Sequence, residues 1–191
     1  MPCGIHRVFL DTNVVQALEW LGAFIWDGDS SVLESRKFRD GGEQSQADFL
    51  ALRNLFGSPR GVPFEVVVSQ RTLTEFQATP QPDRRFALLT YGQDLYDWHV
   101  EADDHPQPTD GEVALALGLR QSHLSALPDE LDRELIGEAV MRDCETFLTL
   151  DRKTILRHQG TVRLVKQWTG LAIMRPSEAW ELFKPWAALW W

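Results

Sequence analysis

The chain has 191 residues, of which 43% are hydrophobic and 25% charged, and its formal net charge is −9. This length and composition fit a single globular domain over residues 1–191, while the two cysteines, Cys3 and Cys144, exclude a disulfide framework and cannot by themselves form a zinc site. The negative charge argues against simple electrostatic binding of a nucleic acid, but it does not exclude a nuclease, because bound divalent cations reverse the local sign of an acidic site.

Short apolar segments that end in polar or turn-prone residues predict buried strands, and amphipathic segments between them predict helices. The predicted strands cover residues 7–10, 64–69, 146–151 and the start of 171–183. The predicted helices cover residues 14–24, 49–56, a segment from about Thr72, 86–98, 109–119, 131–141, a short segment after Asp151, and a last segment opened by Pro176 and Ser177. Strands that alternate with helices favour an α/β fold with a mainly parallel sheet.

Three segments stand apart from this alternation. Residues 27–46 are rich in Asp, Ser and Gly and carry mixed charge, which indicates a loop or an insertion. Residues 101–111 are acidic and contain two prolines, which indicates a second loop. Residues 185–191 form a Trp-rich C-terminal tail, which we expect to cover the core, a second subunit or a partner.

Acidic residues follow three of the predicted strands. In parallel sheets, ligands bind beyond the carboxyl ends of the strands. The first strand ends at Asp11, the third ends at Asp151, and the second leads into a helix that carries Glu75. Each acid also has a structural explanation. Asp11 and Asp151 are favoured residues for capping the helix that follows, and Thr72 with Glu75 matches a capping box.

A fourth acid, Asp132, is harder to explain as a structural residue. It shares a helical stripe with Ile136 and Ala139, so it lies at the edge of the buried face, and no basic residue stands three or four positions after it. The structural alternative is a solvated acid that interacts favourably with the helix dipole. Asp129, one turn earlier, is the fallback for the same role.

Taken in order, the motifs "VFLDTNVV", "SQRTLTEF" and "LDRELIGEAVMRDCETFLTLD" resemble those of PIN domains. These are metal-dependent nucleases that include the VapC-like ribonuclease toxins of toxin–antitoxin pairs. The resemblance implies an α/β/α sandwich with a mainly parallel, about five-stranded sheet and with the acids meeting at one end. Matched by motif, the four acids of the site are Asp11, Glu75, Asp132 and Asp151, and the supporting residues are Thr12, Asn13 and Thr149.

These residue types suit the hydrolysis of a phosphodiester in RNA. The reaction needs a water that is nucleophilic at neutral pH and a stabilised leaving oxygen, and Mg²⁺ or Mn²⁺ can provide both. Such hard cations prefer oxygen ligands, and converging carboxylates repel one another without them. The five histidines show no close ligand spacing, so zinc is not expected. We therefore expect a Mg²⁺- or Mn²⁺-dependent endoribonuclease.

Other classes of protein fit less well. Haloacid dehalogenases need a second acid where this chain has Asn13, and no Gly-rich phosphate loop of a nucleotide-binding enzyme follows a strand. The remaining alternative is a catalytically silent PIN-like scaffold or RNA-binding partner protein.

The expected partners are an RNA substrate and an antitoxin or other protein, and a homodimer is a further alternative. Arg71, Arg152 and Lys153 lie near strand ends and are candidates for binding phosphate, although they also fit ordinary surface cations. No apolar run approaches the length of a membrane span, so we expect a cytoplasmic protein without a membrane partner.

Overall fold

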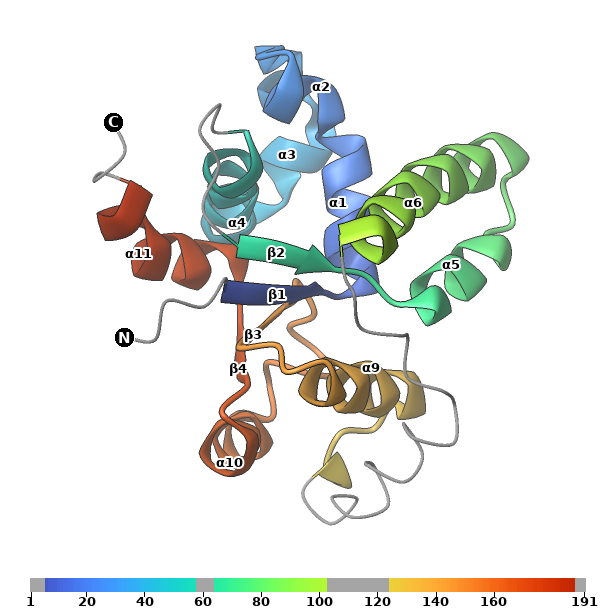
Figure 1. Ribbon diagram of the computed structural model, residues 1–191. Coiled ribbons are helices and arrows are strands. Elements are labelled where there is room, and N and C mark those ends of the chain that lie inside the picture. The colour runs from blue at the N-terminus through green and yellow to red at the C-terminus, as the bar shows by residue number, and fades with distance from the viewer. Residues whose placement is uncertain (1–5, 58–63, 103–123, 188–191) are drawn as a thin grey trace.

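The structure, a computed structural model, describes residues 6–57, 64–102 and 124–187 (Figure 1). Four strands form one all-parallel sheet in the order β2-β1-β3-β4. The strands are β1 (His6–Leu10), β2 (Phe64–Val67), β3 (Thr146–Leu148) and β4 (Ala172–Met174). The α/β class and the parallel sheet are confirmed. The expected fifth strand is wrong for the described residues, because only the four apolar segments seen in the sequence form strands there.

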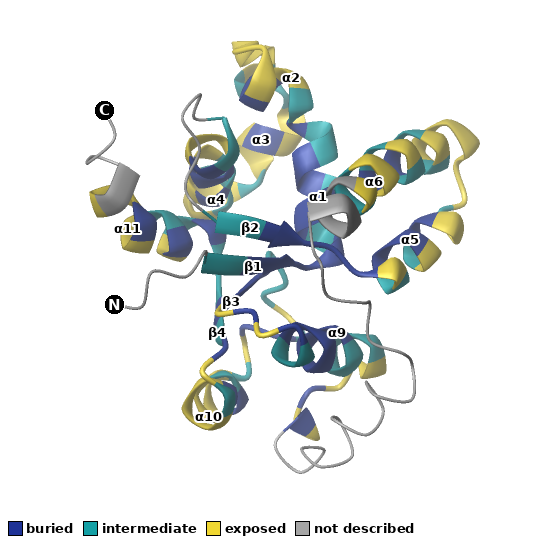
Figure 2. Cartoon of the chain, viewed as in Figure 1, coloured by how far each residue is buried: buried dark blue, intermediate teal, exposed yellow. Residues whose placement is uncertain are grey.

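Helices cover both faces of the sheet, as an α/β/α arrangement requires. Val8 and Leu10 of β1 pack into a core formed with α1, α4, α6 and α11, whereas Phe9 packs with Phe147 into a second core under α9 and α10. Figure 2 shows that β1 and β2 are partly buried where they begin and fully buried toward their carboxyl ends. Burial on both faces is the reason that the strands appear in the sequence as continuous apolar runs rather than as an alternating pattern.

The helices begin and end close to several of the predicted positions. The segments expected at 86–98, at 131–141 and from Pro176 lie within helices of the structure. The segment expected at 14–24 breaks into two at Leu21. The bounds are α1 (Thr12–Trp20), α2 (Gly22–Trp26), η1 (Ser30–Glu34), α3 (Arg36–Asp40), α4 (Gly42–Phe56), α5 (Gln70–Gln77), α6 (Pro82–Ala102), α9 (Glu130–Met141), α10 (Gln159–Thr169) and α11 (Pro176–Ala187).

Short capped helices occupy most of residues 27–46, so a loop is wrong for this segment, whereas an insertion stays a prediction. The Asp29 carboxylate accepts a hydrogen bond from the Ser31 backbone nitrogen and caps η1, and Ser35 caps α3 by accepting one from the Phe38 nitrogen. The Phe38 ring is buried and contacts Phe49 of α4. Two of the residues that suggested a loop, Asp29 and Ser35, are therefore helix caps, and the Phe38 side chain attaches the segment to the core.

Other expectations fall partly outside the described residues. The predicted helix at 109–119 lies outside them, as does most of the loop predicted at 101–111. Of the predicted tail at 185–191, residues 185–187 continue α11 and the rest lie outside. No helix in the described parts of the chain combines the length and the apolar character needed to cross a lipid bilayer.

Candidate metal site

Asp11 lies directly after β1 and is 3% exposed. It occupies the residue before α1, but its side chain makes no capping hydrogen bond. Its Oδ2 atom instead accepts hydrogen bonds from Asn13 Nδ2, at 2.7 Å, and from Thr149 Oγ1, at 2.5 Å. The interpretation of the Asp11 side chain as a helix cap is therefore wrong. Both of these bonds reach Oδ2, so Oδ1 is the oxygen that receives neither.

The three supporting residues all lie around Asp11. Thr149 also accepts a hydrogen bond from the Asp151 nitrogen at 2.9 Å, so one hydroxyl connects the first acid to the backbone of the last. Asn13 Oδ1 accepts from the Leu150 nitrogen at 2.8 Å. The Thr12 hydroxyl lies 3.2 Å from the Thr72 hydroxyl and thereby joins α1 to α5. These contacts connect three chain segments that carry candidate acids.

Glu75 lies on α5 and is not part of a capping box. The N-cap of α5 is Ser69, whose Oγ accepts a hydrogen bond from the Arg71 nitrogen at 3.0 Å, so Thr72 is inside the helix. Burial raises the pKa of Glu75, and the charges of Asp132 and Asp129 raise it further, while the Thr12 hydroxyl opposes them. A role in capping α5 therefore does not explain why Glu75 stands at this position.

Asp132 is the acid whose environment points most directly to a ligand. Its Oδ2 atom is buried and has no hydrogen-bond partner among the described residues. Burial raises the pKa of the Asp132 carboxyl, the Thr154 hydroxyl and the Arg133 charge oppose this rise, and the charges of Asp129 and Asp151 add to it. The fallback residue, Asp129, uses its Oδ1 to cap α9 by accepting from the Leu131 nitrogen at 2.9 Å. Asp132 is therefore the better candidate of the two.

The prediction that Asp151 caps a helix is wrong, but its side chain stabilises the turn that follows it. It lies three residues beyond β3, and its Oδ1 accepts hydrogen bonds from the backbone nitrogens of Lys153 and Thr154, both at 2.7 Å. Residues 152–157 form turns rather than the predicted helix. Burial raises the pKa of Asp151, but the hydrogen bonds from Thr154 and Lys153 outweigh burial and leave this pKa below its usual value. Asp151 is therefore the most readily ionised of the four acids.

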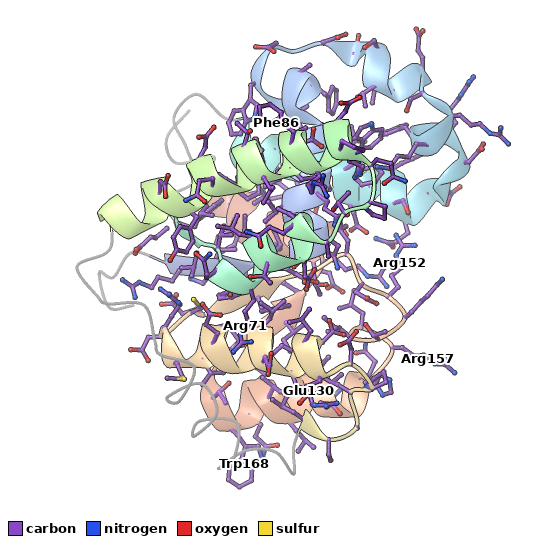
Figure 3. All side chains as sticks on the ribbon, turned by 90° about the vertical axis from the view of Figure 1, so that its right-hand side faces the viewer. Arg71, Phe86, Glu130, Arg152, Arg157 and Trp168 are labelled. Carbon is purple, nitrogen blue, oxygen red and sulfur yellow. The ribbon has the colours of Figure 1, made fainter. Side chains whose placement is uncertain are left out.

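The charges of the four acids act on one another. The Asp132 charge raises the pKa of both Asp11 and Glu75, and the Asp151 charge raises the pKa of Asp132. Asp132 thus shares a repulsive electrostatic neighbourhood with the three other acids. Figure 3 views the molecule from the side toward which β1 and β2 point, where Arg71 at the start of α5 and Glu130 at the start of α9 are labelled.

The oxygen donors of the four acids suit a hard divalent cation, but their side chains do not converge closely enough to coordinate one. Among residues 6–57, 64–102 and 124–187, no group of three or more His, Cys, Asp or Glu side chains is close enough to hold a metal ion as they stand. Carboxylates that repel one another favour rotamers that keep their oxygens apart, and a cation reverses that preference. The unpartnered Oδ2 of Asp132 and the all-oxygen donor set fit Mg²⁺ or Mn²⁺.

Two of the three candidate phosphate-binding cations are held in ion pairs. Arg71 Nη1 lies 2.8 Å from Glu134 Oε2, and Arg152 Nη2 lies 3.1 Å from Asp48 Oδ2. Figure 3 labels both arginines. Lys153 is exposed, and it forms no ion pair with any described residue. Lys153 is therefore the best remaining candidate for binding phosphate.

Sequence reasoning missed two buried acids near the site. Glu138 is 5% exposed, accepts a 2.5 Å hydrogen bond from Ser69 Oγ, and pairs with Arg142 Nε at 3.1 Å. Its spacing of four from Arg142 was a usable signal. Asp48 is fully buried, and its place on one stripe with Leu52 and Leu55, four and seven positions later, was the signal for it.

The raised pKa of Asp11 predicts how the stability of the metal-free protein depends on pH. Burial is the main cause that raises this pKa to about 7, hydrogen bonds from Thr149 and Asn13 oppose it, and the Asp132 charge adds to it. An unfolded Asp titrates near 3.9, so between about pH 4 and pH 7 the folded state retains a proton that the unfolded state releases. The free energy of unfolding should therefore fall as pH rises through this window.

The upper limit for this loss is on the order of 4 kcal/mol, since each pKa unit corresponds to about 1.4 kcal/mol. Urea unfolding in EDTA at pH 5 and at pH 8 measures it. Asp11→Asn, which cannot titrate at this position, should show a smaller difference between the two pH values than wild type. Equal differences in the two proteins would contradict the raised pKa of Asp11.

Taken together, the site places hard oxygen donors from four chain segments in one repulsive neighbourhood, beside hydroxyl and amide groups that hold Asp11 in place. That arrangement can attract a divalent cation and, through it, a phosphate group. Scans against family models, curated proteins and solved structures find no protein that matches this chain.

Proposed function

We propose that this protein is a PIN-like, Mg²⁺- or Mn²⁺-dependent ribonuclease that hydrolyses phosphodiester bonds. The observation that carries the proposal is the buried Oδ2 of Asp132, which has no hydrogen-bond partner among the described residues and lies among acids whose charges repel one another. Repulsive carboxylates are costly to a fold unless a cation neutralises them. The order of the motifs along the chain, which resembles that of PIN domains, supports the same proposal.

In this proposal, Asp11, Glu75, Asp132 and Asp151 hold the cation. When bound, Mg²⁺ or Mn²⁺ supplies the chemistry that makes a water nucleophilic near neutral pH and stabilises the leaving oxygen of the phosphodiester. The chain supplies the orientation. Asn13 and Thr149 both donate hydrogen bonds to Oδ2 of Asp11 and so fix the orientation of this carboxylate. Its other oxygen, Oδ1, receives neither of these bonds.

The substrate class follows from the same residues. Lys153 stands two positions after Asp151 and is exposed, so we expect its ammonium group to contact a phosphate of the RNA. Arg71 and Arg152 are engaged with Glu134 and Asp48 and contribute less to such a contact. Of these three candidate cations, only Lys153 has no ion pair with a described residue, which suits a protein with a net charge of −9 that approaches RNA through bound divalent cations rather than through a basic surface.

The test is cleavage of a labelled single-stranded RNA by the full chain. Cleavage should occur with Mn²⁺ or Mg²⁺, stop in EDTA, and return when Mn²⁺ is added in excess. Asp132→Asn, which keeps the shape of the side chain but removes its charge, should lose the activity. Cleavage that continues unchanged in EDTA, or that survives Asp132→Asn at the wild-type rate, would contradict the proposal.

A second candidate function is a catalytically silent PIN-like scaffold or RNA-binding partner protein. The absence of a closed group of three metal-binding side chains, within the part of the chain that the structure describes, favours it. Titration with Mn²⁺ separates the two. A nuclease binds the ion through Asp11 and Asp132, so that either Asn variant weakens binding, whereas a silent scaffold shows no binding that depends on these acids.

A narrower proposal makes the protein the toxin of a toxin–antitoxin pair, with a small antitoxin as its protein partner. Its support is the resemblance of "VFLDTNVV" and the motifs after it to those of PIN-domain toxins. A neighbouring reading frame that encodes a small antitoxin-like protein would strengthen it. Its absence would leave a ribonuclease that acts without such a partner.

A further inference from the structure

Asp48 is a buried charge with a dense set of polar contacts. It lies on α4, and its side chain is 0% exposed. Its Oδ1 accepts hydrogen bonds from Ser177 Oγ at 2.6 Å, from the Ser177 nitrogen at 3.3 Å and from Gln44 at 3.4 Å. Its Oδ2 pairs with Arg152 Nη2 at 3.1 Å. One carboxylate thus joins α4, the start of α11 and the segment after β3.

Arg152 connects this carboxylate to the candidate metal site. It is the next residue after Asp151, and its Nη2 also donates to Ser45 Oγ of α4 at 3.2 Å. In Figure 3, Arg152 lies beside the helices of the upper layer, whereas Arg157 of the same segment points away from the protein. The Asp48–Arg152 pair therefore holds the segment that carries Thr149 and Asp151 against α4.

The position of that segment decides how the candidate acids meet. Thr149 binds Asp11 Oδ2, and Asp151 contributes to the repulsion felt by Asp132. The backbone around Asp151 is further shaped by its own hydrogen bonds to the nitrogens of Lys153 and Thr154. These local bonds set the turn but not its place in the molecule. The contacts of Arg152 with Asp48 and Ser45 attach the turn to α4, and the buried side chains of Ile155 and Leu156 attach it to the second core.

We propose that Asp48 is a positioning residue for the candidate metal site and acts through Arg152 to hold Asp151 in place for the cation. The inference rests on the proposed function. It also reassigns Arg152 from phosphate binding to positioning. Removing one partner of such a pair also destabilises a fold, so the positioning role is judged from the Mn²⁺ affinity of the folded protein and not from its stability.

The test measures Mn²⁺ binding by calorimetry on the full chain, at a temperature well below the unfolding midpoint of each variant. Arg152→Gln should weaken Mn²⁺ binding by about 10- to 100-fold, the usual range for groups that orient metal ligands. Arg152→Lys, which keeps the charge, should recover part of the loss. Arg157→Ala is the matched control, because Arg157 is exposed on the same segment, and it should bind Mn²⁺ as wild type does.

A double-mutant cycle tests whether Asp48 acts through Arg152. Asp48→Asn combined with Arg152→Gln should weaken Mn²⁺ binding no more than the weaker-binding single variant does. Circular dichroism shows whether Asp48→Asn folds, and if it does not, Arg152→Gln, Arg152→Lys and the Arg157→Ala control still decide the question. A purely structural pair would lower the unfolding midpoint of the variants and leave the Mn²⁺ affinity of the folded protein unchanged.

The outcomes separate this inference from the proposed function. Wild-type protein that binds Mn²⁺ through Asp132, together with Arg152→Gln that binds equally well, overturns the positioning role and leaves the ribonuclease proposal intact. Wild-type protein that does not bind Mn²⁺ overturns both. Loss of binding in Arg152→Gln with recovery in Arg152→Lys supports the positioning role.

Discussion

Asp11→Asn is expected to lower Mn²⁺-dependent RNA cleavage by at least about 100-fold while leaving the metal-free protein as stable as wild type or more stable. Groups that only orient a metal ligand already cost about 10- to 100-fold when removed, so a ligand itself should cost no less. Stability should not fall, because Asn keeps an oxygen that can accept from Asn13 and Thr149, and the substitution removes a buried charge that Asp132 repels.

Single-turnover cleavage of labelled RNA and urea unfolding in EDTA measure the two effects. Asp143→Asn is the matched control. Asp143 is exposed just beyond α9 and has a positive φ of 53°, a backbone conformation that Asn adopts readily. This control should cleave at the wild-type rate. An Asp11→Asn protein that cleaves as fast as wild type would remove Asp11 from the site, and one that unfolds more easily would return it to a structural role.

Arg142→Met is expected to destabilise the fold by about 3–5 kcal/mol, because it leaves the Glu138 carboxylate buried without its charged partner. The side chains of Arg142 and Glu138 are 3% and 6% exposed, and the distance between Nε and Oε1 is 3.1 Å. Ser69 Oγ, which caps α5, donates to the other oxygen of the same carboxylate. Loss of the arginine therefore disturbs the contact between α5 and α9 as well.

Urea unfolding at constant pH measures this change in the free energy of unfolding. Arg36→Met is the control, since Arg36 forms a pair of the same spacing with Asp40 on the exposed surface of α3, and its cost should stay below about 0.5 kcal/mol. Adding Glu138→Gln to Arg142→Met should recover part of the stability, because Gln is neutral and still accepts from Ser69. A cost within 1 kcal/mol for Arg142→Met alone would contradict the account.

The strands and the candidate acids could be predicted because each depends on a local pattern. Leu10 and Leu148 end apolar runs that are buried on both faces, and Asp11 and Asp151 follow them at the carboxyl end of the sheet. Parallel topology then places these ends together without further information. The contact between Thr149 and Asp11 follows from the same registration of neighbouring strands.

The capping and pairing of individual side chains could not be predicted in the same way. Both Ser69 and Thr72 are good N-cap residues, and the choice depends on where the chain leaves β2, which local composition does not specify. The pair between Arg152 and Asp48 joins residues 104 positions apart. Nothing near either residue indicates the other, so Arg152 resembled a surface cation that could bind phosphate.

The central place of β1 has a consequence for how the protein is made. Arg7 of β1 pairs with Glu65 beside it in β2, 58 positions later, and Asp11 meets Thr149 only 138 positions later. Ribosomes add roughly 5–20 residues per second, so the edge of β1 that pairs with β3 stays unpaired for on the order of 10 s until β3 is synthesised. Such distant pairings also close slowly, because the intervening chain must first lose entropy. During synthesis the chain therefore carries an unpaired strand edge that favours aggregation or chaperone binding. The hydrogen bonds around Asp11 are completed only when the segment with Thr149 docks.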